Sequence, residues 1–265
     1  MRFSPRSLTV ILSLYTLTAM FISSMSYTET LAHIPPSERE DISFLALRRT
    51  ALFNDEEYAL IFRQTGLGRG AVNSILPFEL PKYQQMYFSV PEYKCEATTP
   101  VSFEEYVPDP EIKIASVQDG DILYTRASHI LSWRNGHTAI VTDAQSRRTL
   151  EAVVIGSDTA FQSLSKWERY PNFKILRLKD VPFETRQAIA KTAEKHLACK
   201  PYNLLAGIIP LKYCPPEDVS GTQCAHLVWL ACAEYGYDID SDGGAIVTPT
   251  DILNSELLEV VQSYG

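Results

Sequence analysis

The stretch of sequence that says most about the fold is residues 222–232, TQCAHLVWLAC. Its apolar residues, with Cys224 and Cys232 among them, recur at the three- and four-residue spacing of one face of an α-helix. Gly221 and Thr222 lie just before Cys224, where a chain break and an N-cap are expected. The pattern predicts a core-packed helix with Cys224 in its first turn. The positive end of the helix dipole stabilises a thiolate there and lowers the thiol pKa.

A cysteine on an apolar helical face also fits a simpler role, that of a small buried hydrophobic residue. Cys232, two turns further along, is expected to be such a residue. Two features favour Cys224 as a nucleophile instead: its place at the start of the helix, and a histidine upstream in the sequence. A thiol at neutral pH needs a base or a positive neighbour to become a good nucleophile.

His137 is the histidine best placed to be that base. It opens a predicted strand, residues 137–142, which is rich in β-branched residues. Its side chain is therefore expected at one end of a sheet, where a helix start can meet it. His129, in the loop before this strand, is the second candidate, and a strand histidine also fits a structural role. The other three histidines are less suitable: His33 lies beside the signal peptide, His196 on a predicted helix, and His226 on another face of the cysteine helix.

The base needs an acceptor for its other ring nitrogen. Glu151 lies on the predicted return strand of the same hairpin, residues 150–155. Depending on the turn, it lies either directly opposite His137 or diagonal to it, about 7–8 Å away at the backbone, which a glutamate can span. Asp143 and Asp158 are the competing acceptors, and both are predicted to lie in loops. Glu151 also fits a solvated polar face of the sheet.

Strand patterns dominate the second half of the chain. A helix at residues 184–197 follows them, before the cysteine helix. Strands in a meander, flanked by helices, predict an α+β domain with an antiparallel sheet over residues 112–265. The expected strands are residues 120–125, 137–142, 150–155 and 173–178.

Residues 27–111 are expected to form a smaller, mostly helical and irregular region. One helix start follows Pro35-Pro36. A second is marked by Asn54, whose side chain can cap a helix, and by the three acidic residues after it. That helix is expected to end near Gly66. From residue 77 to 110 prolines and aromatics dominate, which indicates an irregular chain with few regular elements.

The first 26 residues have the form of a signal peptide. Arg2 and Arg6 precede an apolar run over residues 8–22, and small residues follow at 24–26. The run is shorter than the roughly 20 apolar residues of a comfortable membrane span. The prediction is a protein that is secreted or held in the cell envelope, with an uncleaved anchor as the alternative.

Composition narrows the partners and the redox chemistry. The net charge is −8 and basic residues do not cluster, which argues against a nucleic-acid partner. Five cysteines leave at least one thiol unpaired in an exported protein. Cys199 and Cys214 are candidates for a disulfide, as is Cys95 with either. No cysteine or histidine spacing resembles a zinc site, so no metal or cofactor is expected. The oligomeric state is left open.

Six short runs, in order, resemble a known group: GDILYT, GHTAIV, LEAV, KPYNLL, TQCAHLVWLAC and TPTDIL. They are similar to the circularly permuted NlpC-type hydrolases, papain-like cysteine peptidases of the YiiX/YaeF-like branch, related to lecithin–retinol acyltransferase. The similarity spans residues 117–253. It implies a papain-like antiparallel sheet packed against the helix that carries the nucleophile. It also implies that Cys224 is the nucleophile, His137 the base and Glu151 the third polar residue.

The chain departs from this group around the cysteine. The group often has Tyr before the cysteine and Ser-Glu after it, whereas Gln223, Ala225 and His226 stand here. The side-chain amide of Gln223 is a candidate donor to an oxyanion.

The resemblance and the predicted export imply cleavage of an amide bond in cell-wall peptides, through a Cys224 thioester. One alternative is a thioesterase, acyltransferase or amidase acting on lipid amides or esters. The apolar run at residues 204–210 fits such a site, or a core. The other alternative is a catalytically inactive binding protein.

Overall fold

The computed structural model describes residues 5–27, 33–90, 92–110, 112–130, 133–209 and 211–265. Two antiparallel sheets and several helices make an α+β fold, as the strand patterns predicted. The main sheet has the strand order β10-β9-β3-β6-β7-β8. Its strands are β3 (Ile122–Thr125), β6 (His137–Asp143), β7 (Arg148–Glu151), β8 (Ala160–Ser163), β9 (Phe173–Leu178) and β10 (Leu258–Tyr264).

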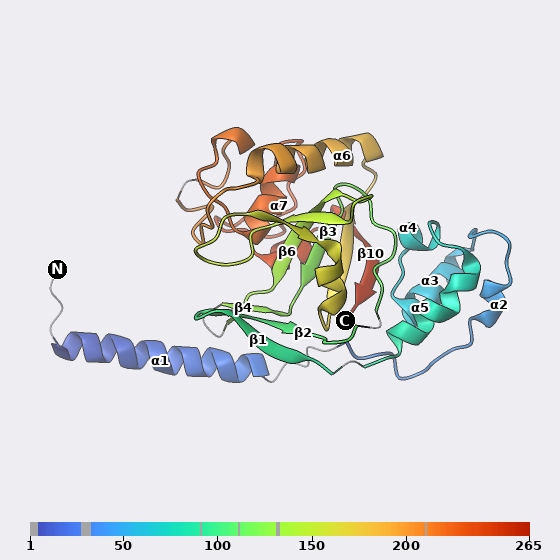
Figure 1. The fold of residues 1–265 in the computed structure, drawn as a ribbon, viewed down its shortest axis with the longest axis horizontal. Helices are drawn as coiled ribbons and strands as arrows, with labels where there is room; N and C mark the ends of the chain where they lie inside the picture. The colour runs from blue at the N-terminus through green and yellow to red at the C-terminus, as the bar shows by residue number, and fades with distance from the viewer. Residues whose placement is uncertain (1–4, 28–32, 91, 111, 131–132, 210) are drawn as a thin grey trace.

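The second sheet has the order β1-β2-β4-β5 and lies below the main sheet in the view of Figure 1. Its first two strands come from the N-terminal region and form a hairpin that pairs with β4. The chain thus joins the N-terminal region to the second half through main-chain hydrogen bonds. The strands are β1 (Lys94–Thr99), β2 (Ser102–Tyr106), β4 (Ser128–Ile130) and β5 (Trp133–Arg134).

Both faces of the main sheet are buried at its central strands, which explains why β6 is apolar or β-branched along most of its length. Ile140 packs on one face in a cluster with Leu227 and Leu230, while Val141 packs on the other with Trp167. Helices α6 and α7 cover the first face (Figure 1). The helical elements of this half are η2 (Leu164–Arg169), α6 (Phe183–Thr192), η3 (Ala193–Leu197), η4 (Pro216–Asp218), α7 (Cys224–Ala233) and α8 (Pro249–Leu253).

Helix α7 begins at Cys224, as the sequence predicted, but its environment and its cap differ from the prediction. Every residue from Cys224 to Cys232 is buried, so the helix is enclosed on all sides and not packed along one face. The N-cap is Gln223 and not Thr222: the Gln223 side chain accepts a hydrogen bond from the N–H of Ala225. Thr222 instead contacts His226.

The helices of the N-terminal region gather at one end of the molecule, at the right of Figure 1. The predicted helix after Asn54 is present: Asn54 and Glu57 form a capping box, and the helix ends at Gly66. The start expected after Pro35-Pro36 yields only a four-residue helix. These elements are α2 (Ser43–Ala46), α3 (Asp55–Thr65), α4 (Arg69–Val72), η1 (Pro77–Glu79) and α5 (Leu80–Tyr87).

The expectation of an irregular chain from residue 77 to 110 was wrong. Helix α5 and the β1–β2 hairpin both lie there. Pro81 falls at the start of α5, where a missing N–H costs nothing, so it begins a helix and does not break one. Strand β2 was hidden because two glutamates, Glu104 and Glu105, occupy it, and both find ionic partners in the fold.

The N-terminal helices attach to the main sheet through β10. The N–H of Gly68 donates to the carbonyl of Val261, and the N–H of Ser263 donates to the carbonyl of Gly66, each at 2.8 Å. Gly66 has a positive φ of 70°, and a Cβ there would lie 1.9 Å from the carbonyl oxygen of Ser263. A glycine is therefore required where α3 meets the sheet.

The predicted signal segment forms helix α1 (Pro5–Tyr27), which extends away from the body in Figure 1. Residues 1–4, including Arg2, lie outside the described part. Within the described ranges, no helix is both long and apolar enough to cross a membrane.

All five cysteines are free thiols. The disulfides considered among Cys95, Cys199 and Cys214 are therefore absent from the structure.

Candidate active site

The two strands of one hairpin bring His137 and Glu151 together. Ile140 pairs with Leu150 across β6 and β7, so Glu151 lies diagonal to His137 and not directly opposite. The Glu151 side chain spans this offset: His137 Nε2 lies 2.9 Å from Glu151 Oε2. Both residues are buried. Of the two registers open from the sequence, the structure has the diagonal one.

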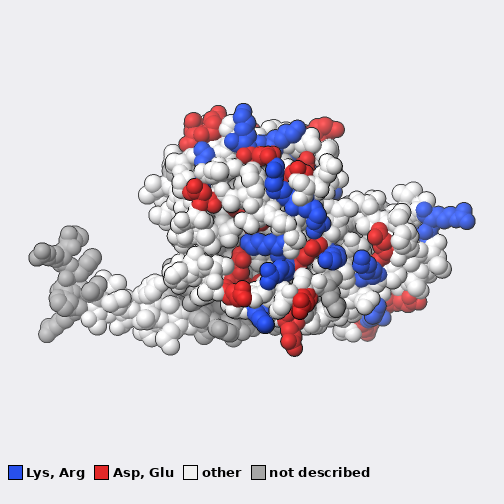
Figure 2. All heavy atoms as spheres, viewed as in Figure 1, with Lys and Arg blue, Asp and Glu red and all other residues white. Residues whose placement is uncertain are grey.

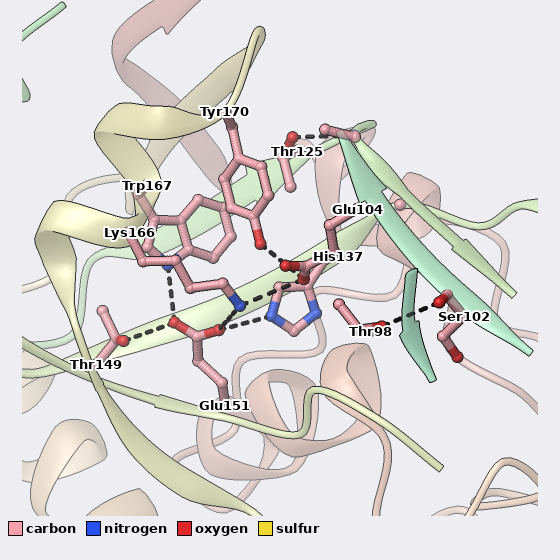
Figure 3. A network of polar contacts seen from close by, with 12 residues as sticks. Thr98, Ser102, Glu104, Thr125, His137, Thr149, Glu151, Lys166, Trp167 and Tyr170 are labelled. Carbon is pink, nitrogen blue, oxygen red and sulfur yellow. Dashed lines mark hydrogen bonds and ion pairs between the residues drawn. The ribbon is translucent and has the colours of Figure 1, made fainter. Parts of the chain in front are cut away.

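Four donors surround the Glu151 carboxylate (Figure 3). Thr149 Oγ1 and Trp167 Nε1 donate to its Oε1 at 2.7 and 2.8 Å. Lys166 Nζ lies 3.3 Å from its Oε2, the oxygen that also faces His137. Burial alone raises the pKa of Glu151, but the charge of Lys166 and the hydrogen bonds from His137 and Trp167 outweigh burial and hold the pKa well below its usual range. Glu151 is therefore a carboxylate at neutral pH.

Trp167 also covers the imidazole. Its ring stacks on that of His137, with centroids 5.6 Å apart and an angle of 16° between the planes. The tryptophan is fully buried, so it keeps water away from the His137–Glu151 contact. Trp167 and Lys166 could not be predicted as site residues from the sequence, because they lie in a 3₁₀ segment with no catalytic motif.

Cys224 meets the other side of the imidazole. Cys224 and His137 shift each other's pKa through a side-chain interaction and through their charges, and the backbone N–H groups of Thr138 and Ala225 favour the charged form of the sulfur. Because His137 Nε2 faces Glu151, Nδ1 is the ring nitrogen left for the sulfur. The structure thus joins Cys224, His137 and Glu151 in one chain of contacts.

The electrostatics of this chain favour an ion pair. Burial alone lowers the pKa of His137, but the hydrogen bonds to Cys224 and Glu151 outweigh it and raise the pKa to about 9. Burial alone raises the pKa of Cys224, but the hydrogen bond and charge of His137 lower it below the ordinary thiol value. Both shifts favour a thiolate beside an imidazolium over a neutral thiol beside a neutral imidazole.

The pKa values of three other thiols shift in the opposite direction. Burial raises the pKa of Cys95 and Cys214, and it raises that of Cys232 to about 12. Cys232 is fully buried in the core, as expected of a small hydrophobic residue. Cys224 itself is only 4% exposed, so a small reagent is the suitable probe of its sulfur.

The competing candidates lie elsewhere. His129 contacts Glu105, 3.0 Å away, which also pairs with Arg134. Asp143 accepts from the N–H of Ser146 in the hairpin turn. Asp158 belongs to an isolated bridge with Pro201. These residues hold local structure, and the structure gives the role of partner to His137 to Glu151.

Gln223, the candidate oxyanion donor, has a structural role at the start of α7. Its side-chain oxygen Oε1 accepts from the N–H of Ala225 at 2.8 Å, and its Nε2 donates to the carbonyl of Val247 at 2.6 Å. A primary amide has two hydrogens on that nitrogen. One hydrogen holds Val247, and the second is the one that an oxyanion would use.

In the described ranges one group of carboxylates has ligand atoms close enough for a metal ion, all within 4.8 Å: Asp240, Asp242 and Asp251. Asp240 pairs with Lys212, and Asp251 caps α8 through Thr248. Both carboxylates thus serve the local fold.

Comparison with known proteins adds little. No protein-family model and no curated protein matches the chain. A solved structure similar to it is the metalloprotein yiiX from Escherichia coli O157:H7, with 16% sequence identity and a TM-score of 0.44. The similarity covers 56% of this chain and 98% of that one. Likeness of this degree assigns no function.

Proposed function

We propose that this protein is a thiol hydrolase in which Cys224 is the nucleophile, His137 the base and Glu151 the residue that orients the base. The observation that carries the proposal is the buried contact of His137 with Glu151, together with the electrostatic coupling of His137 to Cys224 in the first turn of α7. It supports a papain-like arrangement of the site, in which a core helix presents the thiol to a histidine at the start of a strand.

The reaction follows from the charges. The Cys224 thiolate attacks a carbonyl carbon and forms a tetrahedral oxyanion. His137, already protonated, gives its proton to the leaving amine or alcohol, and a thioester remains. His137 then takes a proton from water, which attacks the thioester and releases the acid. Glu151 stabilises the imidazolium and fixes its ring through both halves of the reaction.

Two donors are available for the oxyanion. The backbone N–H of Cys224, at the first position of α7, has no acceptor within the helix. The second amide hydrogen of Gln223 is the other. Preorganised donors of this kind stabilise charge that develops in the transition state.

The proposed substrate is an amide bond in a cell-wall peptide, outside the cytoplasm. The resemblance of the six sequence runs and the form of residues 1–26 support this choice. Surface charge fits an uncharged or mixed target: on the face shown in Figure 2, basic and acidic side chains are interspersed.

One observation favours the second candidate, a lipid amide or ester. Five aliphatic side chains between 47% and 79% exposed project from one loop: Leu204, Leu205, Ile208, Ile209 and Leu211. The root of this loop is tied to the nucleophile's neighbour, because the N–H of Asn203 donates to the carbonyl of Thr222 at 2.8 Å. An apolar loop beside the site suits an acyl chain or a bilayer surface.

A direct test uses purified cell wall and lipid vesicles in parallel. Soluble peptide release from the first and acid release from the second are measured for the full chain and for Cys224→Ser. We expect peptide release that the variant lacks, with an acyl adduct on Cys224 in the rapidly quenched enzyme. Acid release from lipid alone would favour the second candidate. If neither product is released and no adduct forms on Cys224, the remaining alternative is a catalytically inactive binding protein.

A further inference from the structure

Lys166 lies between two glutamates that come from different parts of the chain. Its Nζ is 3.3 Å from Glu151 Oε2 and 3.3 Å from Glu104 Oε1 (Figure 3). Glu104 also accepts a hydrogen bond from Tyr170 Oη at 2.9 Å. Glu104 belongs to β2, in the N-terminal region, whereas Glu151 belongs to the hairpin of the site.

The geometry makes Lys166 a competitor of the imidazolium. Lys166 and His137 both face Oε2 of Glu151, so two positive groups share one carboxylate oxygen. The side chains of Lys166 and Glu104 are 25% and 16% exposed, and that of Glu151 is not exposed. Charges with so little solvent between them are weakly screened.

We propose that Lys166 and Glu104 are positioning residues which hold Glu151 and set the charge on His137, so that the N-terminal hairpin completes the active site. This rests on the proposed function. The Lys166 ammonium reduces the electrostatic stabilisation that Glu151 gives to the protonated imidazole. The Glu104 carboxylate partly neutralises the charge of Lys166 and so reduces that effect. The two side chains therefore act on His137 in opposite directions.

Among the residues that the structure describes, few other titratable or charged groups lie near the His137 imidazole. Burial and the charges of Glu104 and Glu151 raise the pKa of Tyr170 well above its usual value, and burial and the charge of Cys224 raise that of Tyr202, so both phenols are neutral. The titratable and charged groups around the imidazole, by element, are Cys224 on α7, Glu151 on β7, Lys166 on η2, Tyr170 after η2, Tyr202 before the apolar loop and Glu104 on β2.

The test is the pH dependence of Cys224 alkylation by iodoacetamide, followed in the full chain by mass spectrometry of the Cys224 peptide. The rate changes a second time, on the alkaline side, where His137 loses its proton. We expect Lys166→Met to move that alkaline midpoint up and Glu104→Gln to move it down, each by about one pH unit. The double variant is expected near the wild type, because the two effects cancel.

Two controls separate charge from folding. Lys166→Arg keeps the positive charge and is expected to keep the wild-type midpoint. Glu105→Gln removes the neighbouring carboxylate of the same strand, which faces His129 and Arg134, and is expected to leave the midpoint in place. If Lys166→Met does not fold, Glu104→Gln still decides the direction.

The outcomes distinguish this inference from the proposed function. Midpoints that stay fixed, or that move the same way in Lys166→Met and Glu104→Gln, would overturn the opposed roles of the two residues. If instead wild-type Cys224 reacts no faster than the exposed Cys95, the proposed function itself fails.

Discussion

The Nε2 atom of His137 lies 2.9 Å from Oε2 of Glu151, and neither side chain reaches solvent appreciably. This contact crosses a hairpin on the diagonal. It fixes which ring nitrogen is left for Cys224, and it keeps a negative charge where an imidazolium would otherwise be costly to bury.

Glu151→Gln keeps the shape of the side chain and removes its charge. An opposite charge at this range raises a histidine pKa by about one to three units, so its loss lowers the pKa of His137. The alkaline midpoint of Cys224 alkylation is expected to fall by that amount. A midpoint equal to that of the wild type would mean that Glu151 does not act on the base.

Stability should depend on pH through the same pair. In the folded protein the pKa of His137 is about 9, above its ordinary value of 6.5. The contribution of His137 to the free energy of unfolding is therefore complete below pH 6.5 and is lost as the pH rises through 9. Glu151 has a lowered pKa, so its contribution is present above its ordinary value of 4.5 and is lost on acidification. The pair therefore stabilises most between about pH 4.5 and 6.5.

Urea unfolding of the wild type and of Glu151→Gln at pH 6 and pH 10 checks this. Breaking a buried ion pair costs about 3–5 kcal/mol, so at pH 6 the free energy of unfolding of Glu151→Gln is expected to fall below that of the wild type by a gap of that order. The gap should be narrower at pH 10, where His137 is neutral. A gap of the same size at both pH values would show that the imidazolium charge is not involved.

Trp167→Phe should weaken the site without removing any charge. The variant loses the hydrogen bond to Glu151 Oε1, 2.8 Å long, and part of the ring stacked on His137. A buried acceptor that loses its donor costs about 1–3 kcal/mol. We expect a loss of that order in urea unfolding. Trp229→Phe is the matched control, because it also loses one indole hydrogen bond, from Nε1 to Asp238, but none to Glu151.

The signals that predicted parts of this fold are local. Asn54 with Glu57 predicts a helix start because the two side chains satisfy backbone groups three residues apart. The run of β-branched residues after His137 predicts β6 because it is also contiguous in sequence. Cys224 at the head of its helix could be predicted because the break and the apolar pattern are contiguous in sequence.

The remainder depends on contacts between distant segments. Glu104, Lys166 and Trp167 carry no motif, and only the packing of β2 and η2 brings them to Glu151. Strand β10 was missed because its pairing with β9 joins residues about eighty positions apart, and no local pattern records that. The cap of α7 fell one residue from its expected place because Gln223, and not Thr222, turns toward Ala225.

The state of the cysteines gives an independent check of the fold. All five are free, although the predicted export places the chain where disulfides form. Alkylation of the unfolded, unreduced protein is expected to add five groups by mass. Three groups would indicate one disulfide, and would contradict the five free thiols of the structure.

The central claim is that Cys224 is a thiolate beside a protonated His137 at neutral pH. The most direct measurement is the ultraviolet absorbance of the thiolate in the wild type, minus that of Cys224→Ser, from pH 4 to 10. We expect thiolate absorbance to be present already at pH 6 and to be lost at that pH in His137→Ala. Thiolate that appears only above the ordinary cysteine pKa of about 8.5, in the wild type and His137→Ala alike, would contradict it.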